Sequence, residues 1–325
     1  MAFNYTIFLD YLYGSYVETI KEQVHLFNGA SKGSLVLTGG DFIGGMQTQT
    51  FWPLVNDMVR KRNQYDKTSQ IADVEITDDT ESKVKIAAGT DRLITRPSDA
   101  SWIHLPEGEA GRVWGQHLAT YTVKDMLHTA ILGVTTAISQ ETNPSLIRDI
   151  TSAGLNESTK TANLRSLNKT AGIFGDASDL IQAWLMHSTQ WNDLIDSGLT
   201  NTAVLFRYDT VSIMSDVVGR PFIVTDSPFL VNSSTYSVLG LTTGAVTIEG
   251  PNNYLSASER KTGLNNIYDA WQAEWTYNMK IKGYSWNGGQ NTISSPDDPA
   301  IGTSANWLKK RQSHKDLPGV ILKCN

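Results

Sequence analysis

The pattern of apolar and polar positions in the first half of the chain predicts a charged ribbon of strands followed by a long helix. Residues 71–76 alternate apolar and acidic side chains, and residues 83–87 alternate basic and apolar ones. Both segments are therefore predicted to be strands with one face in water. Residues 77–82 have turn composition, because Asp side chains hydrogen-bond nearby backbone amides. The pattern predicts a hairpin with opposite charges facing each other across the two strands.

This ribbon, from about Ile71 to His104, contains too few apolar residues to bury a face of its own. An isolated two-stranded hairpin is marginally stable in water. We therefore expect the ribbon to lie on another part of the chain or on a neighbouring copy.

A single helix is predicted from about Glu109 to Gln140, because apolar side chains recur there at helical spacings and no proline interrupts them. At about 1.5 Å per residue, such a helix is about 45 Å long, comparable to the width of a domain. The side chains expected to form its apolar stripe are Val123, Leu127, Ala130, Ile131, Val134 and Ile138.

The second half of the chain has a more varied pattern. Residues 142–172 are rich in Ser, Thr and Asn and are expected to form loops and short helices. Asp176 is a candidate N-cap for a helix that places Trp184 and Trp191 on one face and ends at Gly198.

Several strands are expected after that helix. Residues 236–241 and 245–249 are predicted to form a hairpin around Thr242, Thr243 and Gly244. Residues 267–284 fit either a helix or a long strand, and alternation over residues 279–286 favours a strand there. Further strands are predicted at residues 203–206, 211–214 and 221–226.

Composition indicates an ordinary folded protein of one large or two smaller domains, with 325 residues of which 40% are hydrophobic. A net charge of −6 argues against a dedicated nucleic-acid binder. The basic runs 60–62 and 309–311 are interpreted as solvated faces or protein contacts. No run approaches the roughly 20 apolar residues of a membrane helix, and no signal-like segment opens the chain, so a soluble, unsecreted product is expected. The single cysteine, Cys324, excludes an intrachain disulfide and a cysteine zinc site.

Candidate chemistry is sparse, since the sequence contains no phosphate-binding glycine loop, HExxH, nucleophile elbow or CxxC motif. His117 and His128 are three helical turns apart, too far to share a metal ion, and are interpreted as packing residues. The acidic pairs 78–79 and 297–298 are interpreted as turn residues. Asp226 follows an apolar run, where an α/β enzyme can place a catalytic carboxylate, but no partner motif accompanies it. We therefore predict no catalytic residue, cofactor or metal.

The order of these parts resembles the major capsid proteins of tailed bacteriophages, which have the Hong Kong 97 fold. The most specific part of the resemblance is the segment 183–188 followed by the Gly-Arg-Pro segment 218–226. Residues 51–55, the basic run 60–62, the ribbon, the long helix and residues 283–287 carry the rest.

The resemblance implies an α+β fold with a long spine helix and a projecting two-stranded loop. Its implied parts are an N-terminal arm (1–58), an extended loop (65–104), a peripheral domain (105–140 and 265–288), an axial domain (141–264) and a C-terminal segment (289–325).

The resemblance also implies a structural, non-enzymatic subunit of an icosahedral or prolate double-stranded DNA capsid, assembled from hexamers and pentamers. The arm and the extended loop would be ordered by contact with neighbouring subunits. The residues expected at such contacts are Phe51, Trp52, Arg60, Arg62, Asp78, Asp79, Lys83, Lys85 and Trp102.

The expected partners are copies of the chain, a scaffolding protein, a portal protein and, as a further candidate, a decoration protein. The chain begins at Met1, so a separate scaffold without proteolytic cleavage is expected. Double-stranded DNA would be enclosed without sequence-specific binding and without a membrane. A mildly anionic inner surface would favour packaging, because tight phosphate contacts impede DNA movement. Assembly is expected in the host cytoplasm, with the product in the virion.

Two alternatives stay open at this point. An encapsulin-like compartment shares the fold but encloses enzymes, and the sequence shows no cargo-binding feature. A soluble α+β hydrolase, or a carbohydrate-binding protein with aromatic platforms, would need a pocket with convergent polar groups.

Overall fold

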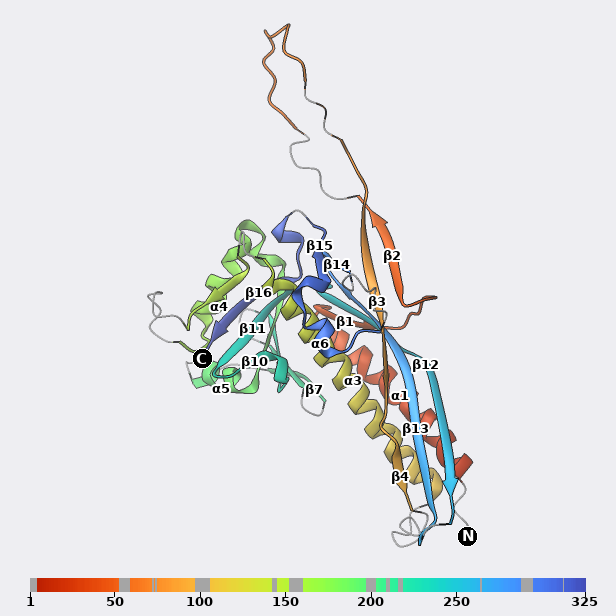
Figure 1. The fold of residues 1–325 in the computed structure, drawn as a ribbon. Helices are drawn as coiled ribbons and strands as arrows, with labels where there is room; N and C mark the ends of the chain where they lie inside the picture. Colours follow the sequence, from red (N-terminus) through yellow and green to blue (C-terminus); the bar gives the residue numbers. More distant parts are fainter. Residues whose placement is uncertain are drawn as a thin grey trace.

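The computed structural model combines long helices with two large sheets, as an α+β fold requires (Figure 1). An elongated body contains the two longest helices, and a second body contains several of the shorter ones (Figure 1). The residues that the structure describes are 5–52, 59–71, 73, 75–96, 106–141, 145–151, 160–196, 203–208, 211–215, 219–263, 265–287, 295–311 and 313–325.

The helices are short except for two. The α-helices are α1 (Tyr5–Ala30), α3 (Glu107–Ser139), α4 (Leu164–Ala171), α5 (Ser188–Asp196) and α6 (Asp298–Ile301), and the 3-10 helices are η1 (Gly172–Leu180), η2 (Pro228–Leu230), η4 (Ser304–Asn306) and η5 (His314–Asp316).

The elongated body is built on a six-stranded sheet with the order β1-β12-β13-β3-β2, in which β4 also pairs with β13. The strands β12 and β13 form its long antiparallel centre, from Val246 opposite Ile281 to Lys261 opposite Tyr268. Its strands are β1 (Leu35–Thr38), β2 (Met46–Phe51), β3 (Asp79–Gly89), β4 (Leu93–Thr95), β12 (Val246–Lys261) and β13 (Tyr268–Ile281).

The second body is built on an eight-stranded sheet with the order β5-β16-β11-β6-β9-β8-β7, in which β10 also pairs with β11. A two-stranded sheet of β14 (Tyr284–Trp286) and β15 (Trp307–Lys309) is separate from both. The strands of the eight-stranded sheet are β5 (Ile147–Asp149), β6 (Ile181–Met186), β7 (Ala203–Tyr208), β8 (Val211–Ser215), β9 (Pro221–Thr225), β10 (Val231–Asn232), β11 (Thr235–Thr242) and β16 (Gly319–Cys324).

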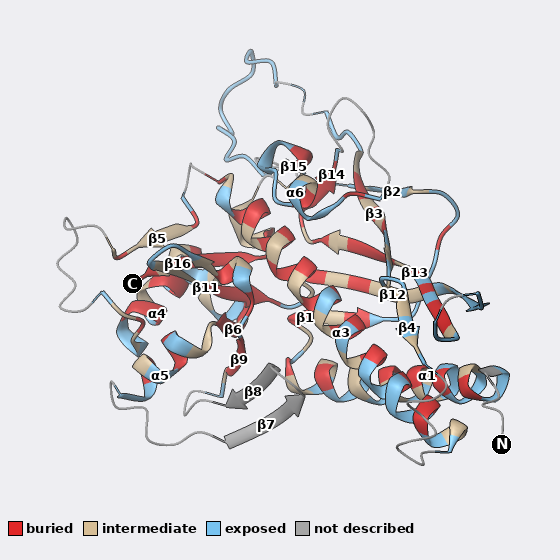
Figure 2. Ribbon diagram, turned by 60° about the horizontal axis from the view of Figure 1, so that its bottom comes forward, coloured by how far each residue is buried: buried red, intermediate tan, exposed pale blue. Residues whose placement is uncertain are grey.

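The predicted long helix is confirmed as α3. Its bounds differ from the prediction by no more than two residues at either end. Figure 2 shows buried residues along the central strands of both sheets and along one side of α3. The six apolar side chains predicted to face the core, Val123, Leu127, Ala130, Ile131, Val134 and Ile138, are each no more than 3% exposed.

The N-terminal segment is different from the extended arm that the resemblance implies. Residues 5–30 form a continuous helix, α1, which packs against α3 of the same chain. Its buried side chains are Phe8, Leu12, Tyr16, Ile20 and Phe27. Their spacing of four, four, four and seven residues is a helical period, so the sequence carried the signal for this helix.

Two glycines of α3 allow α1 to approach closely. A Cβ atom added to Gly111 would lie 2.4 Å from the Phe8 carbonyl oxygen, and one added to Gly115 would lie 2.4 Å from the Leu12 carbonyl oxygen. Such distances are far inside van der Waals contact, so only glycine permits this spacing between the two backbones.

The predicted hairpin between residues 71–76 and 83–87 is wrong. Residues 83–87 are strand, as predicted, but they lie in β3, which begins already at Asp79 and pairs with β2 and β13. The described residues of 71–76 are not strand. The alternating pattern gave the strand type of β3 correctly, but the partners are distant in sequence, and local pattern does not determine them.

The helix predicted from Asp176 to Gly198 is also wrong in its first half. Residues 172–180 are 3-10 helix, residues 181–186 are strand β6, and only α5 is helical as expected. β6 lies between β11 and β9, and five of its six residues are buried. A short apolar run that is buried on both faces has no distinguishing period, so helix and strand cannot be told apart from it.

The hairpin predicted for residues 236–249 separates into two sheets. Both segments are strands, but β11 belongs to the eight-stranded sheet and β12 to the six-stranded one. The turn around Gly244 is the crossover, where the Gly244 amide donates a hydrogen bond to the Gly33 carbonyl. Of the two possibilities for residues 267–284, the long strand is correct and forms β13, and a turn at Lys282 and Gly283 separates it from β14.

Candidate assembly surfaces

A projecting loop, residues 59–78, extends away from the body of the molecule beyond β2 and β3 (Figure 1). Several of its apolar side chains are open to solvent, with Val59 92% exposed and Tyr65 88% exposed. It also carries the basic run 60–62, which is exposed. Extended chain with exposed apolar and basic side chains is stabilised by contact with another surface.

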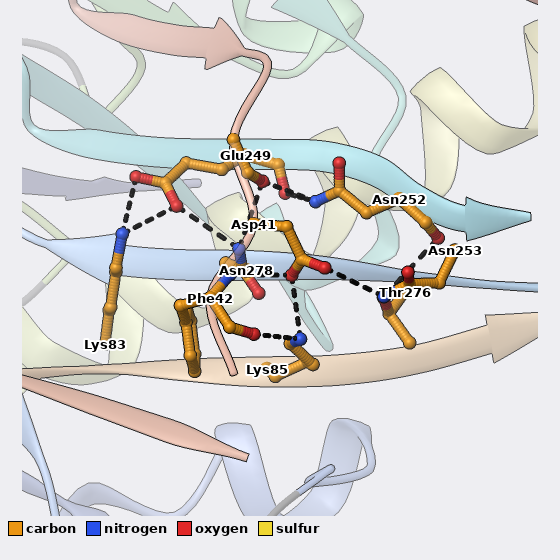
Figure 3. A network of polar contacts seen from close by, with 10 residues as sticks. Asp41, Phe42, Lys83, Lys85, Glu249, Asn252, Asn253, Thr276 and Asn278 are labelled. Atoms are coloured by element: carbon orange, nitrogen blue, oxygen red, sulfur yellow. Dashed lines mark hydrogen bonds and ion pairs between the residues drawn. The ribbon is translucent and has the colours of Figure 1, made fainter. Parts of the chain in front are cut away.

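Ion pairs fix the base of this loop on the six-stranded sheet (Figure 3). Lys83 Nζ lies 2.7 Å from Glu249 Oε2 of β12, and Lys85 Nζ lies 2.7 Å from Asp41 Oδ1. Lys85 also donates to the Phe42 carbonyl and lies 4.9 Å from the centre of that ring. The lysines of β3 thus bind β12, which lies beyond β13 in the sheet, and the segment that precedes β2.

The carboxylate of Asp41 is the most connected group of this network. The hydrogen bond from Lys85 is the main reason that its pKa lies below the ordinary value, and a hydrogen bond of 2.9 Å from Asn253 Nδ2 adds to the effect. Glu249 accepts a further hydrogen bond of 3.2 Å from Asn278. These contacts join three strands that are distant in sequence (Figure 3).

The C-terminal segment holds the other side of the base. Arg311 Nε lies 2.8 Å from Glu81, and Lys280 Nζ lies 3.2 Å from the same carboxylate, which is only 5% exposed. Lys310 Nζ lies 2.9 Å from Asp79, and this hydrogen bond lowers the pKa of the Asp79 carboxyl. A buried carboxylate with two cations is well compensated, so the base is rigid on this side as well.

The structure divides the predicted contact residues into two groups. Phe51, Asp79, Lys83 and Lys85 lie at the base of the loop and contact their own chain; the Phe51 ring centre lies 4.0 Å from the guanidinium carbon of Arg311. The second group, Trp52, Arg60, Arg62 and Asp78, is exposed. Trp102 lies outside the described residues. Contact of any of these residues with a neighbouring subunit stays a prediction.

Opposite charges do not face each other as the predicted hairpin required. The lysines of β3 pair with Glu249 and Asp41 instead. Sequence reasoning missed these acids and the buried Glu81, because their partners lie between 44 and 230 residues away. The only available signal was the basic run 309–311, which was interpreted as a solvated face or protein contact.

Asp226, the candidate catalytic carboxylate, lies 3.6 Å from His187 Nε2. The other ring nitrogen of His187 accepts a hydrogen bond from the Thr189 backbone amide at 3.2 Å, and so caps the first turn of α5. A nitrogen that accepts from the backbone is not free to take a proton from a nucleophile. The pair therefore has the geometry of a helix cap, with Asp226 close to the other ring nitrogen.

Most tryptophans of the described residues belong to the core. Of the nine in the sequence, only Trp52 and Trp114 are exposed among the described residues, at 75% and 39%. The buried ones are Trp184, Trp191, Trp271, Trp275, Trp286 and Trp307.

The described residues include no group of three or more His, Cys, Asp or Glu side chains that could hold a metal ion. Of the two histidines of α3, His128 is partly buried, as the packing interpretation expects, and burial lowers its pKa, whereas His117 is exposed. Within the same described part, no helix is both long and apolar enough to cross a membrane.

Comparisons with known proteins agree with this architecture. A structure from Mycobacterium phage Cain aligns with a TM-score of 0.50 at 10% identity, covering 75% of this chain and 82% of the other. A structure from Microbacterium phage Oxtober96 aligns with a TM-score of 0.51 at 8% identity, covering 90% of both chains. At such identities the likeness shows the fold alone. No curated protein sequence matches the chain.

A family comparison covers nearly the whole chain. The model of the family described as Gp13-like, major capsid protein 13-like, matches residues 4–321. As a capsid protein, the chain is a component of the virion that associates with copies of itself. The chain therefore belongs to the major capsid protein 13-like family and is a structural subunit of a phage capsid.

Proposed function

We propose that this subunit builds an icosahedral or prolate shell around double-stranded DNA by forming hexamers and pentamers with the Hong Kong 97 arrangement. The observation that carries the proposal is the projecting loop. This loop extends from the body and is exposed, and ion pairs hold its base on both sides. A rigid base with an unpartnered extension is suited to reach a neighbouring subunit.

In this arrangement the projecting loop overlaps the extended loop (65–104), and α3 is the spine helix of the peripheral domain. The axial domain is centred on the eight-stranded sheet, which β16 of the C-terminal segment joins by pairing with β11. The arm (1–58) uses α1 to bind the spine helix of its own chain, and its strand β2 pairs with β3.

We propose a structural role without catalysis. The His187 and Asp226 pair is explained by capping of α5. The alternative of a hydrolase would need a nucleophile beside that pair. The Thr189 hydroxyl lies 3.1 Å from His187 Nδ1, but this nitrogen already accepts a hydrogen bond from the Thr189 backbone amide and so cannot activate the hydroxyl.

The proposed partners beyond the chain itself are a scaffolding protein, a portal protein and a decoration protein, with assembly in the host cytoplasm. The enclosed DNA is held without sequence-specific contacts. The net charge of −6 supports an inner surface that repels phosphate and so leaves the genome free to move. A strongly positive inner surface in an assembled shell would contradict this last point.

Electron microscopy with analytical ultracentrifugation tests the proposal directly. The chain is expressed alone and with its neighbouring open reading frames, and closed shells or sheets of hexamers are expected. A stable monomer in both settings would overturn it. Nuclease treatment of purified native particles then distinguishes protected DNA from the enzyme cargo that an encapsulin-like compartment would hold.

A further inference from the structure

A groove of about 670 Å³ lies beside α3, bordered by the ends of β3 and β13 and by the residues that begin α6. Aromatic side chains line much of it, among them the exposed Tyr121 and Trp114 and the buried Trp271 and Trp275. Aromatic faces attract cations, and guanidinium groups stack on them especially well.

The same groove is acidic. Four aspartates contribute to its lining, and no lysine or arginine is found among the described lining residues. The pKa of Asp125 is raised, chiefly because the surrounding protein desolvates its carboxylate and additionally because the negative Asp298 is near. The negative charge of the groove is thus not neutralised by cations from its own wall. The four residues are Asp91, Asp125, Asp297 and Asp298.

We propose that this groove receives the basic run 60–62 from the projecting loop of a second copy; the proposal rests on the shell function proposed above. The run supplies three consecutive cations for the aspartates and the aromatic faces. It is exposed in the subunit and makes no ion pair with the described part of its own chain.

The contact is between copies and not within one chain. The projecting loop leaves the body at the ends of β2 and β3, whereas β4, which follows the groove residues of β3, lies at the opposite end (Figure 1). The loop therefore points away from its own groove.

A second acidic groove offers a control. It lies between α1 and α3 and is lined by Asp10, Glu18 and Glu22. This groove contains its own cation, Arg112, and no tryptophan. The basic run is therefore expected to prefer the groove beside β13.

Cysteine cross-linking distinguishes the two grooves. The native Cys324 is fully buried, so added thiols report alone. Shells of the double variant Arg60→Cys with Asp298→Cys are expected to give covalent dimers and higher ladders under mild oxidation. Shells of Arg60→Cys with Glu22→Cys are the matched control and are expected to stay monomeric in denaturing gels. Ladders in the control alone, or in neither variant, would overturn the proposal.

Charge reversal provides a second measurement, which tests the proposal even if a cysteine variant fails to assemble. Arg60→Glu with Arg62→Glu, and separately Asp91→Lys with Asp298→Lys, are each expected to lose closed shells in electron micrographs while circular dichroism of the subunit is unchanged. The chain carrying all four changes is expected to regain shells. Lys67→Glu, an exposed charge elsewhere in the loop, is expected to assemble as the wild type does.

Failure of the four-substitution chain to assemble, with wild-type shells present, would contradict the docking proposal. Absence of shells from the wild-type chain would instead contradict the shell function itself. The two proposals are thereby separated.

Discussion

At the base of the projecting loop, individual charged side chains join strands that lie far apart in the sequence. Glu81, Asp79, Lys83 and Lys85 all belong to β3 and bind partners in the segment before β2, in β12, in β13 or near the C-terminus. Such pairs contribute more than ordinary surface pairs only where the surroundings exclude water. We therefore expect the more deeply buried pairs to contribute more to the stability of the fold.

Glu81 is the strongest case, because it is buried and binds two cations. Replacing it with alanine would leave Arg311 and Lys280 without their shared carboxylate. We expect Glu81→Ala to lower the free energy of unfolding by about 1–3 kcal/mol, measured by urea denaturation of the unassembled subunit. Glu259→Ala, which removes a mostly exposed partner of Arg92, is the control and is expected to cost less than about 1 kcal/mol. Equal effects would contradict the role of burial.

The pair of Asp41 and Lys85 predicts a pH dependence. Because the pKa of Asp41 is lowered in the fold, its pair contributes fully to stability above the ordinary Asp value of about 3.8 and is lost as the pH falls through the lower folded value. The urea midpoint of the wild type should therefore exceed that of Asp41→Asn at neutral pH, and the difference should shrink in acid. Lys85→Met should show the same trend. A difference that is constant with pH would contradict this assignment.

At the scale of elements, hydrophobic periodicity predicted those helices and strands that bury only one face. The stripe of α3 gave a correct helix, because one buried face over many turns leaves a clear period. β6 has buried side chains on both faces and no such period, so its helical assignment failed. β11 and β12 were identified as strands, yet their partners were wrong, because pairing depends on contacts across the whole chain.

The contact of α1 with α3 depends on small residues. Gly111→Ala places a methyl group where the Phe8 carbonyl lies, so we expect a loss of about 1–3 kcal/mol in the free energy of unfolding as the helices separate. Gly14→Ala lies in α1 with nothing within 4 Å, and is expected to stabilise by up to about 1 kcal/mol through helix propensity. Thermal unfolding of the two variants measures both. Equal stability of Gly111→Ala and the wild type would contradict close packing.

At the scale of the whole molecule, an extension with a rigid base requires a second molecule to cover it. Trp52 follows β2 directly and is 75% exposed, although aromatic residues of this size are usually at least partly buried. We therefore propose that it is an anchor residue at the interface between subunits.

Trp52→Ala therefore should leave the subunit fold unchanged but weaken assembly. We expect the unfolding free energy to stay within about 0.5 kcal/mol of the wild type, since the side chain is exposed. The association free energy per contact should fall by about 2 kcal/mol, seen as a higher concentration threshold for shells in ultracentrifugation. Leu255→Ala is the control, because Leu255 is also an exposed apolar residue but lies on β12, away from the loop. If Trp52→Ala assembles as the wild type does, Trp52 is not part of the interface.

The sequence alone determined the class of the protein, the spine helix and the strand character of β3, β9 and β11, because each depends on local period and composition. It also allowed the capsid resemblance, which the family match confirms. The tertiary structure decided the strand partners, the helical N-terminal segment packed on α3, and the ion pairs that fix the base of the loop. These features depend on residues up to 231 positions apart, and only the folded chain brings such residues within hydrogen-bonding distance.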